Sequence, residues 1–283
     1  MSTNLNDLVD NVYVLNLERE SFKYDIVKRK LNDKNIQHQR FVGVDMRDNS
    51  FSLKEKEESF RRMIDQYRGE SLYDKVLVIG AEVLFSGYGA FRYGGALGCL
   101  LSHIKILEDA IKKKYKKILF LQDDIYFHRD FDTLLDVHAE TIRSSAVFYL
   151  GATENMLPLM QNKWSDPNWA YRRNKYAPTE KTYGMFGVIV DEGMFESLLK
   201  LMKSKFFAAD QCLSILASIP KKNALQYDYW VAFPNLIMAD TRFSNTFEGV
   251  SYSHGQEHRA LKSWSQKKGW NLEYYDLSEK YYK

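Results

Sequence analysis

Residues 118–126 read ILFLQDDIY, a stretch in which an apolar run ends in an amide and two adjacent carboxylates before the chain turns apolar again. A compact apolar run of this kind predicts a buried strand of an α/β sheet. Neighbouring like charges repel each other and resist burial, so a chain that only had to leave a strand would use glycine, asparagine or proline. Asp123 and Asp124 therefore indicate a compensating positive charge, with two solvated loop aspartates as the structural alternative.

The sequence before this stretch alternates between strand and helix patterns. Residues 96–115 carry a broad apolar stripe at helical spacing, which predicts a helix. Its last turn holds several lysines, and it begins directly after Gly94 and Gly95. Near the N-terminus, the pattern is a β-α-β opening of the kind that starts nucleotide-binding sheets. Its expected elements are a strand over residues 12–17, a helix over 22–31 and a strand over 36–44, which Asp45 directly follows.

The same alternation continues after residues 118–126, which predicts one α/β domain. The stretch 152–180 has no clear period but holds two tryptophans and two arginines, which favours a binding loop. The other expected elements are helices over 53–67, 131–142, 194–202 and 210–219, strands over 76–80, 146–151 and 182–190, and a glycine-dense bend over 86–95.

Length and composition describe an ordinary globular protein. With 283 residues, 45% hydrophobic and 27% charged, we expect one large domain over residues 1–243 and an extension over 244–283. The net charge of +3 is small and the basic residues are scattered, which argues against a nucleic-acid partner. Cys99 and Cys212 fit neither a disulfide framework nor a metal spacing, and the N-terminal apolar run is short, so the sequence predicts a cytoplasmic protein.

Several short blocks occur in an order that matches a known family. Residues 12–24 contain Asn16, Leu17 and Arg19 as an Asn-Leu-x-Arg signature, and residues 40–45 read RFVGVD. Further blocks are GALGCLLSH at 95–103, LFLQDD at 119–124, FAADQCL at 207–213 and FPNLIMAD at 233–240. Together they resemble glycosyltransferase family 25, which includes lipopolysaccharide and collagen galactosyltransferases.

The resemblance implies the glycosyltransferase-A fold, a Rossmann-like mixed sheet flanked by helices that binds a nucleotide sugar and a divalent cation. The donor-binding residues implied by the resemblance are Asn16, Arg19, Asp45, Ser102, His103, Gln122 and Asp123. Two of them have a structural alternative: Arg19 also fits a surface position at a helix start, and His103 also fits a hydrogen-bonded core histidine.

The metal site implied by the resemblance departs from the family pattern. Alternation along a strand would place Gln122 and Asp124 on one face and Asp123 on the other. Gln122 replaces a family glutamate and Ala96 replaces another, which weakens the expected binding of Mn²⁺ or Mg²⁺. The expected metal ligands are Asp124, Gln122 and His254, although a solvated loop histidine is the alternative for His254.

The implied reaction is transfer of a hexose, galactose or glucose, from a UDP-sugar to a hydroxyl of a glycan, lipid-linked or protein acceptor, with inversion. Asp210 is the expected base and Asp240 the reserve candidate, while an ordinary helix N-cap is the alternative for Asp210. The more serious rival class is a non-catalytic nucleotide-sugar-binding protein with a degenerate site. A nucleotidyltransferase is the other, and the lack of glycine in NLERES after the first strand argues against it. Residues 258–275, basic and aromatic, fit either a peripheral membrane contact or a packed C-terminal cover.

Overall fold

The computed structural model of the protein describes residues 3–45, 94–154, 174–178, 182–205, 208–218, 229–240 and 271–277. Within these ranges the main sheet has seven strands in the order β2-β1-β3-β9-β5-β10-β7. Its strands are β1 (Asn11–Asn16), β2 (Gln39–Val42), β3 (Lys117–Gln122), β5 (Val147–Tyr149), β7 (Lys175–Tyr176), β9 (Gly187–Asp191) and β10 (Tyr229–Ala232).

The main sheet is mixed. Strands β2, β1 and β3 are parallel, β9 runs antiparallel between β3 and β5, and β10 is parallel to β5 with β7 antiparallel at the edge. Two short antiparallel pairs accompany it: β4 (Ile125–Phe127) with β11 (Ile237–Ala239), and β6 (Thr153–Glu154) with β8 (Thr182–Tyr183). The predicted α/β fold with a mixed sheet is confirmed.

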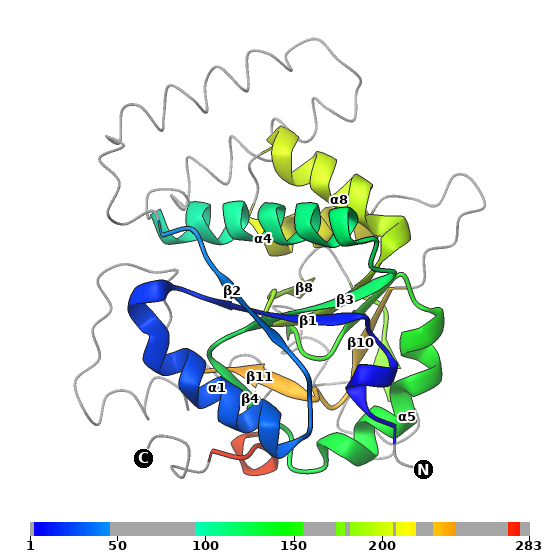
Figure 1. Ribbon diagram of the computed structural model, residues 1–283. Coiled ribbons are helices and arrows are strands. Elements are labelled where there is room, and N and C mark those ends of the chain that lie inside the picture. The colour runs from blue at the N-terminus through cyan, green and yellow to red at the C-terminus, as the bar shows by residue number, and fades with distance from the viewer. Residues whose placement is uncertain are drawn as a thin grey trace.

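Helices cover both faces of the main sheet (Figure 1). On one face lie α4 (Gly94–Lys113), α8 (Glu192–Lys205) and α9 (Ala209–Ser218), which pack against one another. On the other lie α1 (Ser21–Asp33) and α5 (Phe131–Ser144).

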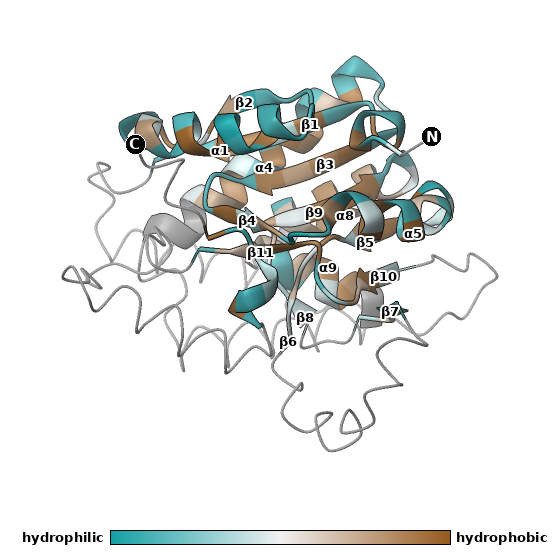
Figure 2. Cartoon of the chain, turned by 90° about the horizontal axis from the view of Figure 1, so that it is seen from below, coloured by the Kyte–Doolittle hydropathy of each residue, from teal (hydrophilic) through white to brown (hydrophobic). Residues whose placement is uncertain are grey.

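Strand β3 shows why this sequence is buried between two layers. Leu119 and Leu121 pack in the core with α1 and α5, whereas Ile118 and Phe120 pack in the core with α4, α8 and α9. Successive side chains of a strand point to opposite faces, so a continuous apolar run supplies both cores at once. Figure 2 shows β3 as one of the most hydrophobic strands of the sheet.

Some predicted boundaries differ from the structure. Helix α4 begins at Gly94, so both glycines belong to its first turn and do not precede it. Helix α1 begins at Ser21, and in it Phe22 is 53% exposed whereas Lys23 and Lys30 lie on the buried face. The helix predicted over 53–67, the strand over 76–80 and most of the bend over 86–95 lie outside the described residues.

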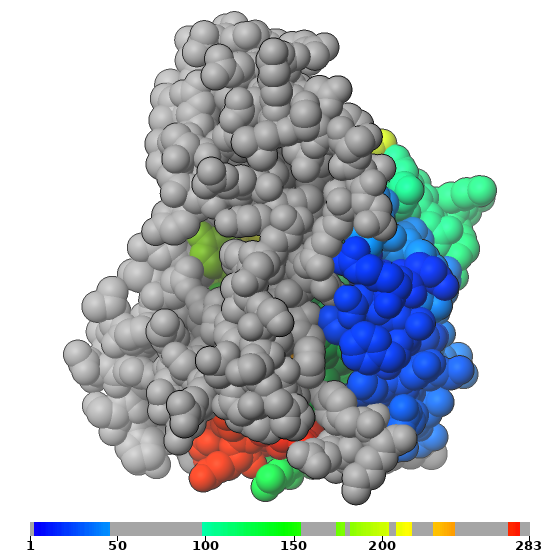
Figure 3. All heavy atoms as spheres, turned by 90° about the vertical axis from the view of Figure 1, so that its left-hand side faces the viewer, coloured from blue at the N-terminus to red at the C-terminus, as the bar shows by residue number. Residues whose placement is uncertain are grey.

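Residues 271–277, near the C-terminus, pack at the β4 end of the domain (red in Figure 3). The Tyr275 hydroxyl donates to the Asn235 carbonyl at 3.0 Å, and the Asp276 N–H donates to the Phe127 carbonyl at 2.9 Å. These contacts place residues 271–277 against the domain, and the division of the chain at residue 243 stays a prediction. No helix within the described ranges is long and apolar enough to span a membrane.

Candidate functional site

The carboxyl ends of the parallel strands β1, β2 and β3 meet at one edge of the sheet, where ligands of α/β proteins bind. Strand β3 ends at Gln122, and Asp123 and Asp124 form the bend that leads into β4. The alternation of side chains along a strand therefore does not set the directions of the two carboxylates. Their contacts do.

Asp123 turns toward β1. Its Oδ2 accepts a hydrogen bond from Nδ2 of Asn16 at 2.6 Å. Burial raises the pKa of Asp123, and the bond from Asn16 and the positive charge of Lys23 oppose that rise. The carboxylate is thus fixed by the amide of a neighbouring strand.

Asp124 has the more unusual environment. Its Oδ1 is buried and accepts no hydrogen bond from any residue in the described ranges. Burial raises the pKa of Asp124 to about 8, the negative charges of Asp123 and Asp240 add to this rise, and Lys23 opposes it. A buried carboxylate oxygen without a donor is costly, so this position favours a cation.

Asp240, which is distant in sequence, also lies beside Asp124. Strand β11 pairs with β4, and the Asp240 N–H donates to the Asp124 carbonyl. The Asp240 side chain is 2% exposed, and its Oδ2 accepts a hydrogen bond from the Tyr126 hydroxyl at 2.8 Å. The carboxylates of Asp123 and Asp240 therefore both act on Asp124 at this edge.

Part of the compensating positive charge belongs to the protein itself. Lys23 of α1 is 5% exposed, and its Nζ lies 3.3 Å from Oε2 of Glu20. Its charge favours the ionised form of both Asp123 and Asp124 and so lowers their pKa values against the effect of burial. One lysine, shared with Glu20, does not neutralise three carboxylates.

Asp210, the expected base, lies in the first turn of α9. Its Oδ1 accepts from the Gln211 N–H at 2.9 Å and its Oδ2 from the Gly184 N–H at 3.2 Å. Burial raises the pKa of Asp210, and these two bonds oppose the rise. Burial also raises the pKa of Cys99 to about 12, with Asp210 and Asp124 adding to it, so both carboxylates lie near this thiol.

The remaining donor-binding candidates near β2 lie in two groups. Arg19 and Asp45 form an ion pair at the surface. Ser102 is buried in α4, where its hydroxyl donates to the Gly98 carbonyl at 2.6 Å and accepts from the Val44 N–H at 2.8 Å. Ser102 thereby ties the residues that follow β2 to the helix.

The other two donor-binding candidates, His103 and Gln122, differ in burial. His103 is buried against Phe120, with 5.3 Å between ring centroids, and its Nδ1 hydrogen-bonds the Cys99 carbonyl at 2.8 Å. Burial lowers the pKa of His103 to about 4, so it is a neutral core histidine at pH 7. Gln122 is half-buried, and its backbone N–H donates to the Phe186 carbonyl at 3.3 Å.

Sequence reasoning did not assign roles to Arg40, Glu20 or Tyr126. Arg40 donates from Nε and Nη2 to Oδ1 of Asn16 at 3.0 and 2.7 Å. Arg40 lies two residues before Val42, the register partner of Asn16, so a parallel pairing of the first two strands would have placed both side chains on one face. Tyr126 had no comparable signal, because its partner lies 114 residues away.

The chemistry of the carboxylates suits a hard cation such as Mn²⁺ or Mg²⁺, since Asp124 presents a buried oxygen without a donor. In the described part of the chain, no group of three or more His, Cys, Asp or Glu side chains is arranged to coordinate a metal ion by itself. His254 and the side chain of Ala96 lie outside that part.

Residues 93–213, which include part of this site, match a known protein family. A family model described as glycosyltransferase family 25 (LPS biosynthesis protein) matches residues 93–213, and no curated protein matches the chain. The matched region contains Asp123, Asp124 and Asp210, whereas Asn16 precedes it and Asp240 follows it. The resemblance to glycosyltransferase family 25 is thereby confirmed over residues 93–213. A match to this family supports glycosyltransferase activity as the class of function. The mixed sheet flanked by helices is consistent with a glycosyltransferase-A-like fold.

Proposed function

We propose that this protein is an inverting glycosyltransferase that moves a hexose, galactose or glucose, from a UDP-sugar to a hydroxyl group of a glycan, lipid-linked or protein acceptor. The family match supports the transferase class. The observation that carries the proposal is the buried Oδ1 of Asp124, which has no hydrogen-bond donor among the described residues and lies near Asp123 and Asp240. Such a site is suited to a cation and the diphosphate that accompanies it.

The cation we propose is Mn²⁺ or Mg²⁺, bound by Asp124 with the amide oxygen of Gln122 and with His254. Asp123 and Asp240 add negative charge beside it. When bound, the ion supplies positive charge that stabilises the leaving diphosphate. Gln122 contributes no charge where the family has a glutamate, so we expect weak cation affinity.

The proton chemistry is assigned to Asp210. The acceptor oxygen attacks the anomeric carbon as the bond to UDP breaks, and its proton passes to the Asp210 carboxylate. Burial raises the pKa of Asp210, which strengthens it as a base, and the N–H groups of Gly184 and Gln211 orient it. Asp240 is the second candidate, although the bond from Tyr126 occupies its Oδ2.

Donor binding is assigned to the β1 and β2 ends. We propose that Arg19 and Asp45, paired at the surface, meet the base and ribose, because both have polar atoms at the edge where the parallel strands end. The side chains of Ser102 and His103 are both buried in α4, so Ser102 would act through the residues after β2 that it bonds and His103 through the helix itself. A cytoplasmic location with peripheral membrane contact through residues 258–275 completes the proposal.

The second candidate function is a nucleotide-sugar-binding protein without turnover. It is favoured by Gln122 and Ala96, which stand where the family has glutamates and so reduce the acidic charge of the site. The two candidates differ in one observable, the release of nucleotide.

The test is nucleotide release from a panel of UDP-, GDP- and CMP-sugars with Mn²⁺, Mg²⁺ or a chelator. We expect UDP release from one UDP-hexose, lost in Asp124→Asn and Asp210→Asn. Release should be retained in the control Asp132→Asn, which changes an exposed aspartate of α5 that pairs with Lys34. NMR of the product would show an anomeric configuration opposite to that of the donor. Binding without release would favour the second candidate, and neither binding nor release would overturn the assignment of the donor site.

A further inference from the structure

The side-chain amide of Asn16 uses its full hydrogen-bonding capacity at the sheet edge. It is 1% exposed at the end of β1. Its Nδ2 donates to Oδ2 of Asp123 at 2.6 Å and to the Glu20 carbonyl at 2.9 Å. Its Oδ1 accepts from Nε and Nη2 of Arg40 at 3.0 and 2.7 Å.

The chemistry of the partners fixes the orientation of this amide. A guanidinium can only donate, so the oxygen of Asn16 must face Arg40. A backbone carbonyl can only accept, so the nitrogen must face Glu20 and, beside it, Asp123. An asparagine amide has two N–H donors and an oxygen that accepts two bonds, and all of this capacity is used inside the protein.

Arg40 is itself restrained. Its Nη2 lies 3.2 Å from Oε2 of Glu18, and its guanidinium lies 5.1 Å from the ring centroid of Tyr24. The guanidinium polarises the Asn16 carbonyl, which strengthens the N–H bonds that the same amide donates. The positive charge of Arg40 therefore acts on Asp123 through Asn16, without a direct ion pair in the described structure.

We propose that Asn16 is a positioning residue that orients the Asp123 carboxylate at the donor site and relays the charge of Arg40, and that it makes no contact with the donor itself. This inference rests on the proposed function, since the donor is the ligand that Asp123 would meet. It differs from the role implied by the family resemblance, in which Asn16 contacts the nucleotide.

A double-mutant cycle on donor affinity separates the two roles. Isothermal titration would give the Kd of UDP and of the UDP-hexose for wild type, Asn16→Ala, Asp123→Ala and the double variant. We expect Asn16→Ala to weaken binding roughly ten-fold in the wild-type background and less than about two-fold in the Asp123→Ala background, as for residues that act through one another. Equal losses in both backgrounds would overturn the proposal, because they would show direct contact with the donor.

Matched variants control for general damage. Asn11→Ala removes an amide at the other end of β1, whose Nδ2 donates to Oε1 of Gln39 at 3.1 Å. Arg29→Gln removes an exposed arginine of α1 whose Nε donates to the Asp25 carbonyl. Both are expected to keep wild-type donor affinity, whereas Arg40→Gln should weaken it in the same direction as Asn16→Ala.

A second cycle needs no donor. It measures the free energy of unfolding in urea for the same four proteins, for Asn16→Asp and for the swap Asn16→Asp/Asp123→Asn. The coupling between the two positions then reports the bond between the two side chains. Asn16→Asp alone should be the least stable variant, because it brings two carboxylates to a hydrogen-bond distance, and the swap should recover most of the loss while donor binding stays weak.

The outcomes are distinguishable. Additive unfolding effects would overturn the proposed bond and with it the positioning role. Coupled unfolding with no binding of any nucleotide sugar by wild type would overturn the proposed function and the role toward a donor, and would leave the bond as a structural one. Coupling in both cycles supports the inference.

Discussion

The Tyr126 hydroxyl donates a hydrogen bond of 2.8 Å to Oδ2 of Asp240, which joins residues 114 positions apart in the chain. Tyr126 lies in β4 and Asp240 directly follows β11, its antiparallel partner. The bond holds Asp240 beside the bend that carries Asp123 and Asp124. The negative charge of the candidate site thus depends on a strand pair that the central sheet does not include.

Tyr126→Phe tests this bond. We expect the free energy of unfolding to fall by about 1–3 kcal/mol, because a buried carboxyl oxygen loses a donor. If Asp240 contributes to the donor site, affinity for UDP also falls. The control Tyr274→Phe changes a tyrosine that is 53% exposed and should alter stability by less than about 0.5 kcal/mol. Equal effects of the two variants in urea unfolding would contradict the expectation.

Asp124→Asn tests cation binding without any assay of activity. We expect Mn²⁺ to raise the Tm of wild type, since an ion that binds the folded state stabilises it by about 2.7 kcal/mol at one hundred times its Kd. The rise should disappear in Asp124→Asn and persist in Asp132→Asn, and a chelator should reverse it. A similar rise in Asp124→Asn would place the ion elsewhere.

Lys117→Met tests how the sheet is joined to α5. The Nζ of Lys117 donates to the carbonyls of Ile142, Arg143 and Ser145 at 2.7, 2.9 and 3.0 Å, at the helix end where negative backbone charge gathers. We expect a loss of roughly 2–4 kcal/mol of unfolding free energy, because buried carbonyls lose their donor.

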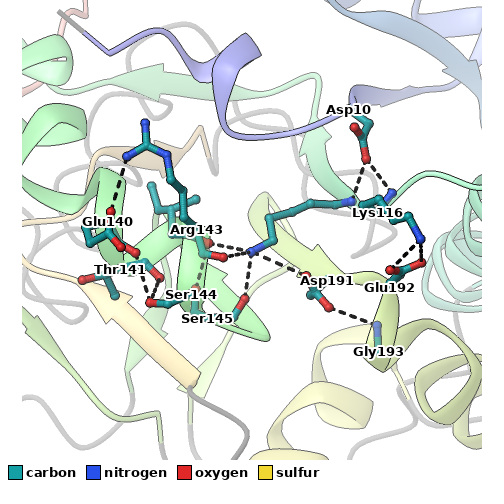
Figure 4. Close-up of polar contacts among 12 residues, drawn as sticks. Asp10, Lys116, Glu140, Thr141, Arg143, Ser144, Ser145, Asp191, Glu192 and Gly193 are labelled. Atoms are coloured by element: carbon teal, nitrogen blue, oxygen red, sulfur yellow. Dashed lines mark hydrogen bonds and ion pairs between the residues drawn. The ribbon is translucent and has the colours of Figure 1, made fainter.

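The adjacent lysine is the matched control for this substitution. Figure 4 shows Lys116 paired with Glu192, on the side away from Arg143 and Ser145. This pair is exposed, so Lys116→Met should leave the urea midpoint close to that of wild type. Equal losses for Lys116→Met and Lys117→Met would show that the bonds to α5 do not contribute as proposed.

His138 makes stability depend on pH. It is 0% exposed in α5, neither ring nitrogen has a hydrogen-bond partner among the described residues, and burial lowers its pKa to about 4, with Lys175 adding to the effect. The unfolded chain takes up this proton near pH 6.5, so stability falls as pH drops from about 6.5 to 4, by about 3 kcal/mol for this group. Above that window His138 contributes no pH dependence.

Two variants separate the titration of His138 from its packing. His138→Phe and His138→Gln should both remove its share of the acid loss, measured as urea midpoints between pH 4 and 7, while the share of His103 remains. His138→Phe should also be more stable than wild type at pH 7, because an aromatic ring beside Phe148 replaces unpartnered polar atoms. An unchanged pH dependence in both variants would contradict the assignment.

Patterns along the chain were enough to predict the elements that form the two cores. The apolar run in residues 118–121 became β3, and the stripes over 96–115, 131–142 and 194–202 became α4, α5 and α8 with boundaries shifted by a few residues. The helices show their buried faces through the helical spacing of their apolar residues, and β3, which is buried on both faces, shows its burial through an unbroken apolar run. The short strands β4, β7 and β10 carried too few residues for such a signal.

The sequence by itself determined that two carboxylates follow a buried strand and that blocks typical of glycosyltransferase family 25 surround them. The tertiary structure decided which side chains meet them. Asn16 contacts Asp123 because β1 and β3 are parallel neighbours, and Asp240 joins Asp124 because β11 pairs with β4. A hydrogen bond or a pKa depends on partners brought together by strand register across more than a hundred residues, and no local period encodes that register.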